Sequence, residues 1–205
     1  MIKVLVTGAS GFVGKSIIEE LNQRDFFTVA VGRKSVLTKA NFFVAVPDYS
    51  AKDIWQKTLL NCNVIIHLAA RVHVMNDEVT NPLKSFLAVN LHNTVNLAEA
   101  AAKAGVKRFV FVSSIKVNGE FTEIQPFTEN DLPNPQDPYA VSKYEAEKAL
   151  RQIEKETGMQ VVILRPPLIY GAGVKANFAA LLRLVDKKLP LPLANINNKR
   201  SLIYV

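Results

Sequence analysis

A tyrosine followed four residues later by a lysine is the first pattern in the sequence that could do chemistry. On a helix the two side chains share a face, and the positive charge of the lysine can pull the tyrosine pKa down from its ordinary value of about 10. Such a tyrosine can take the proton of an alcohol while hydride leaves the adjacent carbon. The pattern occurs twice, as Tyr139 with Lys143 and as Tyr144 with Lys148. Because five residues of helix rotate a side chain by about 140°, only one pair can face a given site.

The chain before Tyr139 favours the first pair. Asp137-Pro138 is typical of a helix N-cap followed by a first-position proline, and the proline-rich stretch 119–138 indicates a long loop of the kind that is usually functional. Ser114 follows an expected strand at its carboxyl end, where open α/β sheets place their sites. We therefore expect Tyr139 and Lys143, rather than the second pair, to be catalytic, with Ser114 near them at the strand end. The second pair is expected to lie at the surface.

Three glycines follow the first apolar run of the chain, and a helical pattern follows them. Glycines at such a turn let the backbone approach a pyrophosphate and bring the helix against the strand, and the helix N-terminus offers N–H groups to the phosphates. This strand–turn–helix context predicts a dinucleotide-binding site. The residues expected to contact the cofactor there are Gly8, Ser10, Gly11, Phe12, Val13 and Gly14.

The end of the second expected strand should select between the two nicotinamide dinucleotides. An acidic residue there would bind the ribose hydroxyls of NAD, whereas a basic residue accommodates the extra phosphate of NADP. The strand is followed by Arg33 and Lys34, with no acid beside them. On charge alone the sequence favours NADP; the alternative is that both basic residues are merely solvated.

Strand-like apolar runs alternate with amphipathic helical patterns along the chain. Near-continuous apolar runs are typical of parallel strands buried on both faces, and the alternation implies right-handed crossovers. The expected fold class is therefore α/β, a doubly wound parallel sheet of the Rossmann type. The expected strands are Ile2–Val6, Phe26–Val31, Phe42–Val46, Val64–Leu68, Phe109–Ser113 and Val161–Leu164. The expected helices are Val13–Asn22, Ala51–Leu60, Leu83–Ala104, Tyr139–Thr157 and Ala176–Lys187.

Composition excludes several other classes. The chain has 205 residues, 49% of them hydrophobic and 21% charged, as in an ordinary globular protein. No apolar run approaches the roughly 18 residues of a membrane span, the N-terminus lacks a signal-peptide pattern, and the single cysteine suits a reducing compartment, so we expect a cytoplasmic protein. The net charge of +7 is scattered, which favours phosphorylated small molecules over nucleic acid. We expect no metal site, because His67 and His73 lack further ligands; His67 is expected to be a core residue.

The spacing G-x-x-G-x-x-G and the segments Pro138–Lys143 and Phe111–Gly119 resemble the extended branch of the short-chain dehydrogenase/reductase superfamily. The resemblance implies that Ser114 is the catalytic serine and that Lys143 binds the cofactor ribose. It also makes Tyr139 and Lys143 cofactor contacts as well as catalytic residues. It also implies that Asp48 binds the adenine amino group. The small-residue segment over which the cofactor would pass is Leu68, Ala69 and Ala70.

Further segments resemble the nucleoside-diphosphate-sugar epimerases, which belong to the NAD-dependent epimerase/dehydratase family. The resemblance is to epimerases of the UDP-glucose 4-epimerase type. Arg165–Gly171, with Pro166 as a cofactor contact, is similar to the segment that covers the nicotinamide. Asn177 and Arg200 match residues that contact the substrate diphosphate, the arginine through its forked guanidinium. Leu189–Leu193 matches the segment along the nucleotide base.

Two local features separate members of this family. Dehydratases of the branch carry Asp-Glu directly after the catalytic hydroxyl residue, but this sequence has Ile115 and Lys116 there. Without these carboxylates the elimination of water has no acid or base, so a dehydratase is disfavoured. The segment 67–75, with Lys116 and Lys175, is similar to the corresponding residues of family members that take part in surface-polysaccharide synthesis. In this segment His73 is a further candidate substrate contact.

The leading hypothesis is 4-epimerisation of a nucleotide sugar by transient hydride transfer to bound NAD or NADP. Tyr139 would take the proton of the sugar 4-hydroxyl, with its pKa lowered by Lys143, and hydride would return to the other face of the 4-keto sugar. Two alternatives stay open. One is an NADP-dependent reductase of a keto-sugar or other ketone, which Arg33 favours. The other is a non-catalytic NAD(P)-sensing module, which the intact Ser114, Tyr139 and Lys143 disfavour.

The domain organisation follows from the same resemblance. Residues 1–165 are expected to form the dinucleotide-binding domain, and residues 166–205 the beginning of a substrate lobe. Enzymes of the branch run to about 300 residues by resemblance, so we expect a truncated chain that binds cofactor with little turnover, restored in a longer form. The resemblance also implies a homodimer built from the Leu83–Ala104 and Tyr139–Thr157 helices.

Overall fold

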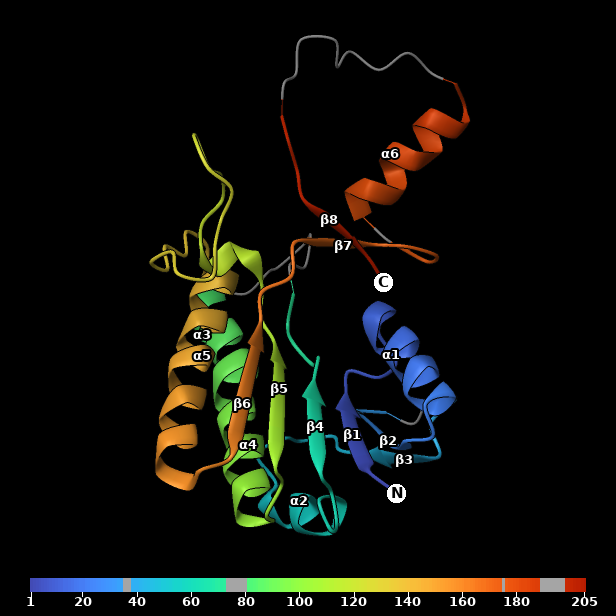
Figure 1. Ribbon diagram of the computed structural model, residues 1–205, viewed down its shortest axis with the longest axis vertical. Coiled ribbons are helices and arrows are strands. Elements are labelled where there is room, and N and C mark those ends of the chain that lie inside the picture. The colour runs from blue at the N-terminus through green and yellow to red at the C-terminus, as the bar shows by residue number, and fades with distance from the viewer. Residues whose placement is uncertain (35–37, 73–80, 175, 189–197) are drawn as a thin grey trace. The chain divides into compact units, whose positions relative to one another are not determined.

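The computed structural model describes residues 1–34, 38–72, 81–174, 176–188 and 198–205. These residues form two compact units, Met1–Arg165 and Pro166–Val205 (Figure 1). In the described part of the chain, no helix is long and apolar enough to cross a membrane.

The first unit is built on a parallel sheet, which among the described residues has six strands in the order β3-β2-β1-β4-β5-β6. The strands pair in register, so that Thr7 at the end of β1 lies opposite both Val31 and His67. The carboxyl ends of the central strands therefore share one edge, and the predicted doubly wound fold is confirmed. The strands are β1 Lys3–Thr7, β2 Phe27–Gly32, β3 Phe42–Ala45, β4 Val64–His67, β5 Arg108–Val112 and β6 Gln160–Leu164.

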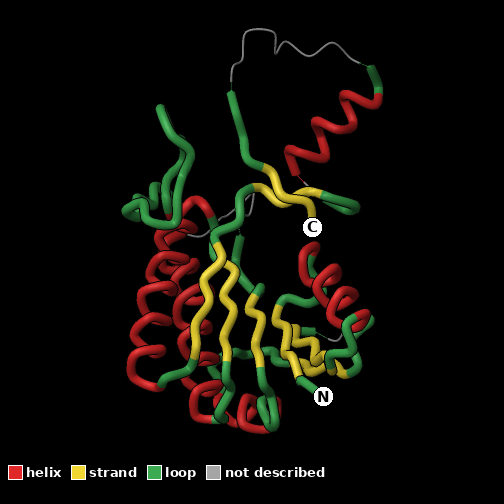
Figure 2. The backbone as a smooth tube through the Cα atoms, viewed as in Figure 1, coloured by secondary structure: helices red, strands yellow, loops and turns green. Residues whose placement is uncertain are grey.

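Helices cover both faces of this sheet (Figure 2). Helix α1 packs on one face, where Ile18 joins a small core with residues of β1 and β2. Helices α2, α4 and α5 pack on the other face, where Trp55, Leu97 and Leu150 join the larger core. The helices of this unit are α1 Phe12–Gln23, α2 Lys52–Thr58, α3 Pro82–Leu87, α4 Asn93–Lys103 and α5 Pro138–Thr157.

The expected single helix Leu83–Ala104 is interrupted. A π-helical turn, Ala88–His92, lies between α3 and α4. The apolar periodicity continues on either side of the turn, which is why the interruption was not predicted. Such turns are rare in proteins, and those that occur often lie at functional sites.

The start and end of α5 follow the predicted signals. The Oδ1 atom of Asp137 accepts a hydrogen bond from the N–H of Ala140 at 2.7 Å, and Pro138 occupies the first turn. Gly158 closes the helix with a φ of 74°, a conformation that favours glycine. The preceding residues 119–137 contain no helix or strand beyond this cap, as predicted. These signals place Tyr139 in the first turn of the helix.

The second unit contains a two-stranded parallel pair and one helix among its described residues. Strand β7, Leu168–Tyr170, pairs with β8, Leu202–Tyr204, and helix α6 spans Ala176–Asp186. Gly171 follows β7 with a φ of 150°, and a Cβ on it would lie 2.6 Å from Val205 Cγ1. The pair therefore depends on glycine at this turn. Strand β7 was not predicted from the sequence.

Candidate active site

The glycine turn joins β1 to α1 at the carboxyl edge of the sheet. Gly8 has a φ of 67°, and a Cβ on it would lie 2.9 Å from the backbone N of Ala69. A Cβ on Gly14 would lie 2.3 Å from the carbonyl oxygen of Gly8 and 2.7 Å from Ala9 Cα. Both positions therefore require glycine, while Gly11 donates its N–H to the Gly8 carbonyl at 2.9 Å. Of the other predicted contacts in this turn, Ser10 is exposed, and Phe12 and Val13 are half-buried.

The segment after β4 is held by a buried threonine at the end of β1. The hydroxyl oxygen of Thr7 accepts the N–H of Leu68 at 3.2 Å and the N–H of Ala69 at 3.1 Å. These contacts join the glycine turn to the segment 68–70 at neighbouring strand ends. The two backbone segments predicted to contact the cofactor thus lie at the same edge of the sheet.

Tyr139 and Ser114 meet at this edge, the first from α5 and the second from the segment after β5. Burial raises the pKa of Tyr139, and hydrogen bonding by the Ser114 side chain lowers it. Asp137 raises this pKa further, and Lys116 lowers it. Phe86 packs edge-on against the tyrosine, with ring centroids 6.1 Å apart. The predicted proton-transferring group and its predicted hydroxyl partner are therefore brought together.

Lys143 lies on the same helix as Tyr139 and is buried in the core of the first unit. Its side chain is 1% exposed, and its ammonium lies 4.0 Å from the centroid of the Phe111 ring. Burial lowers the pKa of Lys143 to about 7, although Glu147 acts to raise it. The ammonium of Lys143 therefore faces a phenylalanine ring, and among the described residues the cation that acts on the pKa of Tyr139 is Lys116. That Lys143 lowers the pKa of Tyr139 stays a prediction.

The second tyrosine–lysine pair lies at the surface, as predicted. The ammonium of Lys148 lies 5.1 Å from the Tyr144 ring centroid and 2.8 Å from Glu145 Oε2, and the lysine side chain is 52% exposed. An ion pair of this exposed kind contributes little to stability.

A buried hydrogen-bond network begins at Thr7 and runs through His67. The Thr7 hydroxyl donates to His67 Nδ1 at 2.7 Å, and His67 Nε2 donates to the Thr94 hydroxyl at 2.9 Å. These roles follow because Thr94 uses its own hydrogen toward the Asn90 carbonyl, at 2.8 Å. Burial, with the nearby charge of Lys143, lowers the pKa of His67 to about 3. His67 is thus a neutral, fully hydrogen-bonded core residue.

Asn90 continues the network from the π-helical turn to α5. Its amide accepts the N–H of Arg71 at 2.8 Å and donates to the Arg71 carbonyl at 3.0 Å. It also donates to the Ser142 hydroxyl at 2.9 Å, which in turn donates to the Tyr139 carbonyl at 2.7 Å. The π-helical turn thus places one buried amide between the segment after β4 and the first turn of α5.

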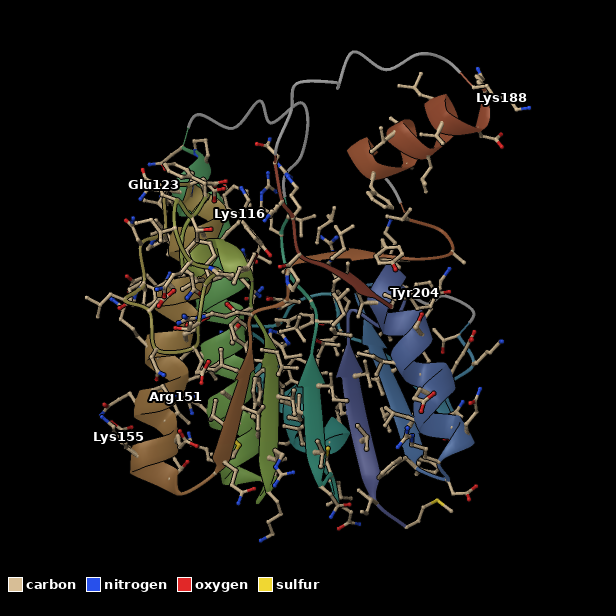
Figure 3. The ribbon with its side chains drawn as sticks, turned by 45° about the horizontal axis from the view of Figure 1, so that its top comes forward. Lys116, Glu123, Arg151, Lys155, Lys188 and Tyr204 are labelled. Carbon is tan, nitrogen blue, oxygen red and sulfur yellow. The ribbon has the colours of Figure 1, made fainter. Side chains whose placement is uncertain are left out.

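Lys116 follows Ser114 in a short 3-10 turn, Ile115–Val117, at the carboxyl end of the sheet (Figure 3). Its ammonium lies 2.6 Å from Asp137 Oδ2 and 2.9 Å from Glu120 Oε1. Burial acts to lower the pKa of Lys116, but hydrogen bonds to these two carboxylates outweigh it, and the pKa is raised. The position at which a related dehydratase would carry a carboxylate therefore holds a charged lysine.

Arg165 clamps a buried carboxylate that was not predicted from the sequence. Its Nε donates to Glu147 Oε1 at 3.0 Å, its Nη2 donates to Oε2 at 2.5 Å, and its Nη1 donates to Asn118 Oδ1 at 3.0 Å. Asn118 also donates to the Thr128 carbonyl at 3.1 Å. The clamp ties the end of β6 to α5 and to the long loop. The one signal in the sequence was the spacing of Glu147, four residues after Lys143.

The two residues predicted to select and bind the adenosine end of the cofactor are exposed. Arg33 follows β2, and its charge acts on Tyr49, whose pKa burial raises to about 12. Asp48 follows β3 and accepts hydrogen bonds from the Ser50 N–H and hydroxyl, both at 2.8 Å, which lower its pKa. Both charged side chains are therefore open to solvent near the ends of β2 and β3.

The remaining predicted contacts lie in the second unit or outside the described residues. Pro166 and Arg200 belong to the second unit, and Arg200 is exposed. Asn177 lies in α6, with its side chain outside the described part. His73 and Leu189–Leu193 lie outside the described residues.

The edge of the first unit fits a dinucleotide in three respects. The turn at Gly8 and Gly14 has no room for a Cβ, so the start of α1 packs tightly against the end of β1, as a dinucleotide-binding turn requires. Among the described residues the buried Ser113 hydroxyl has no hydrogen-bond partner, and the buried Lys143 ammonium faces a ring. Such groups are uncommon, and both suit the hydroxyls of a ligand. No group of three His, Cys, Asp or Glu in the described ranges could hold a metal ion.

Comparison with known proteins identifies the family of the chain. Residues 4–205 match the model of the NAD dependent epimerase/dehydratase family. The chain belongs to this family. A UDP-glucose 4-epimerase of Vibrio cholerae is 45% identical over 205 residues, and the match covers 98% of this chain but 62% of that protein. A GDP-6-deoxy-D-mannose reductase of Pseudomonas aeruginosa is 31% identical over 178 residues, covering 86% of this chain and 55% of that protein.

Solved structures of the family share the fold. The UDP-glucose 4-epimerase of Thermus thermophilus in complex with NAD matches with a TM-score of 0.82 at 27% identity, covering 99% of this chain and 70% of that one. The resemblance inferred from the glycine turn and the tyrosine segment is thereby confirmed at the level of the family. The chain spans about 62% of the length of its Vibrio cholerae relative.

Proposed function

We propose that the protein is a nucleotide-sugar 4-epimerase that works through transient hydride transfer to a bound nicotinamide dinucleotide. The observation that carries the proposal is the meeting of Tyr139 and Ser114 at the same strand ends as the glycine turn. The 45% identity to a Vibrio cholerae UDP-glucose 4-epimerase supports it. The proposed substrate class is a nucleoside-diphosphate hexose or N-acetylhexosamine.

The family resemblance and the closeness of Tyr139 to Ser114 support the following catalytic roles. A nicotinamide dinucleotide bound at the glycine turn would supply the acceptor, and later the donor, of the hydride. Tyr139 takes the proton of the 4-hydroxyl and later gives it back, while Ser114 hydrogen-bonds the same oxygen and holds it in place. Lys143 binds the hydroxyls of the cofactor ribose, which favours its charged form against the lowering of its pKa by burial.

The test is an epimerisation assay without any added reductant. The protein at its natural length is incubated with NAD and either UDP-glucose or UDP-N-acetylglucosamine, and proton NMR follows the products. We expect a mixture of the two 4-epimers with no net change in NADH absorbance. Failure to form an epimer, together with consumption of NADPH when a keto-sugar is added, would contradict the proposal.

A second candidate function is an NADP-dependent keto-sugar reductase. The exposed Arg33 after β2 favours it, since a guanidinium suits the extra phosphate of NADP. The 31% identity to a Pseudomonas aeruginosa reductase is in line with this candidate. Titration of wild type and Arg33→Ser with NAD and with NADP decides the role of the arginine. We expect the substitution to weaken NADP about tenfold and to leave NAD unchanged; equal effects on both would rule out phosphate binding by Arg33.

We also propose that the protein is a cytoplasmic homodimer that serves polysaccharide biosynthesis. The family resemblance supports this proposal, and so does the placement of α4 and α5 side by side on one face of the sheet. Analytical ultracentrifugation at natural length should give the mass of a dimer. A monomer at micromolar concentration would contradict the dimer.

A further inference from the structure

Lys116 is held in place from two directions although it lies close to solvent. Its side chain is 34% exposed, and its ammonium lies 2.9 Å from Glu120, which belongs to the long loop. The second partner, at 2.6 Å, is Asp137 in the N-cap of α5. Because the two carboxylates come from opposite ends of the loop 119–137, they fix the position of the ammonium.

Asp137 connects this lysine to the helix of Tyr139. Its Oδ2 atom accepts from the Lys116 ammonium at 2.6 Å, and its Oδ1 atom accepts the N–H of Ala140 at 2.7 Å. One carboxylate therefore binds both the lysine and the first turn of α5, in which Tyr139 lies.

The backbone of Lys116 contacts the other member of the catalytic pair. Its N–H donates to Ser114 Oγ at 3.3 Å, so the serine hydroxyl caps the 3-10 turn that carries the lysine. Lys116 thus contacts Ser114 through its main chain and the helix of Tyr139 through its side chain. A single residue therefore bridges the two segments that supply the catalytic pair.

We propose that Lys116 is a positioning residue for the Ser114–Tyr139 pair, which it ties together through Asp137 while keeping a positive charge within electrostatic reach of the tyrosine. The role rests on the proposed function, since it serves the proton transfer assigned to Tyr139. It also explains why a lysine occupies a position where a related dehydratase would carry a carboxylate.

Several charged groups lie around Tyr139, and their effects on its pKa differ in sign. Asp137, at the N-cap of the same helix, opposes the ionisation of the tyrosine, and Glu120 forms an ion pair with Lys116. Lys143 contacts a phenylalanine ring, and Arg71 lies over the neighbouring Phe86 ring at 5.7 Å. Among the described residues, Lys116 is the cation that lowers the pKa of Tyr139. Its replacement by a neutral residue would remove the positive charge that offsets the two carboxylates.

The test titrates Tyr139 directly, so that it does not depend on turnover. The 205-residue chain is labelled with carbon-13 at the tyrosine ring, and Tyr139→Phe assigns the signal. Lys116→Met is compared with Lys116→Arg, which keeps the charge. The second control is Lys148→Met, because Lys148 is exposed and also forms an ion pair with a glutamate, at 2.8 Å. We expect Lys116→Met to raise the pKa of Tyr139 by at least about 0.5 unit, Lys116→Arg to restore it, and Lys148→Met to leave it unchanged. Thermal unfolding of each variant verifies that the fold is kept.

A Tyr139 titration that stays in place in Lys116→Met, or that moves equally in Lys148→Met, would overturn the inference. Turnover at natural length gives a second reading. In Lys116→Met we expect kcat to fall about tenfold with KM unchanged, and the acid limb of the pH profile to move to higher pH, because the base must be deprotonated. A shifted titration in a protein that makes no epimer would refute the proposed function and leave the role of Lys116 standing.

Discussion

Two polar clusters flank Tyr139, and they differ in burial and in charge. The inner network consists of Thr7, His67, Asn90, Thr94 and Ser142. The outer cluster consists of Lys116, Glu120 and Asp137. The side chains of the inner network are completely or almost completely buried and carry no charge, because the pKa of His67 is lowered to about 3. The outer cluster carries three charges and is partly open to solvent.

The difference separates two tasks at one site. A buried, fully paired, neutral network holds backbone segments in a fixed arrangement, because breaking any one of its hydrogen bonds leaves a buried polar group unpaired. A partly exposed set of charges can change the acidity of a neighbour at little cost in stability, because water screens it. We infer that the inner network sets where Tyr139 lies and that the outer cluster sets how readily it ionises.

The largest effect is expected at the tyrosine that both clusters serve. Tyr139→Phe keeps the ring against Phe86 and removes the hydroxyl to which we assign the proton transfer. We expect turnover at natural length to fall about 1000-fold while the melting temperature changes little. Tyr144→Phe is the control, and a comparable loss of turnover in that variant would show that the wrong pair was assigned.

Lys143 belongs to neither cluster, and its replacement should separate activity from stability. Its pKa of about 7 in the folded chain lies below the ordinary 10.5, so burying the charged lysine opposes folding below about pH 7, and the penalty fades as the pH rises toward 10. We expect Lys143→Met to lose turnover yet to raise the free energy of unfolding by about 2–4 kcal/mol at pH 6. Urea unfolding at pH 6, 8 and 9.5 measures the gain, which should shrink with pH. A destabilised variant at pH 6 would refute the lowered pKa.

The inner network is tested by two matched threonines. The hydroxyl of Thr94 donates to the carbonyl of Asn90, and that of Thr58 donates to the carbonyl of Ile54, each four residues back in a helix. Thr94 differs because it also accepts from His67. We expect Thr94→Val to cost about 1–3 kcal/mol more than Thr58→Val in urea unfolding. Equal costs would mean that the His67 contact contributes nothing.

The smallest effect is expected on the exposed side of α5. Lys148→Met breaks an ion pair in which the lysine side chain is 52% exposed. We expect the midpoint of urea unfolding to stay the same within error, with the titration of Tyr139 unaffected. A clear shift of the midpoint to lower urea would show that exposure does not weaken this ion pair as expected.

Local signals in the sequence were sufficient for the fold. The alternation of apolar runs, the cap at Asp137 and the glycine at 158 located α5 to within a residue of its predicted start. Glycine spacing predicted the turn at Gly8 and Gly14, where the structure leaves no room for a Cβ. These features depend on residues close together in the chain, which is why they can be predicted without a structure.

The features that were missed depend on contacts between distant residues. Asn90 bonds to Arg71 and Ser142, 19 and 52 residues away, and Arg165 bonds to Glu147 across 18 residues. The orientation of the Lys143 ammonium toward a ring of β5 was likewise not visible in a spacing of four residues. Helix periodicity predicts which residues share a face of the helix, but not which of their side chains will contact a neighbouring strand.

The central claim is that the Tyr139–Ser114 edge serves a hydride transfer that begins and ends on the same sugar. The most direct test uses UDP-glucose deuterated at C4, with the protein at its natural length and no added reductant. We predict a 4-epimer that keeps its deuterium, and no epimer from the Tyr139→Phe variant. An epimer that has exchanged its deuterium for solvent hydrogen, or no epimer at all from the wild type, would contradict the claim.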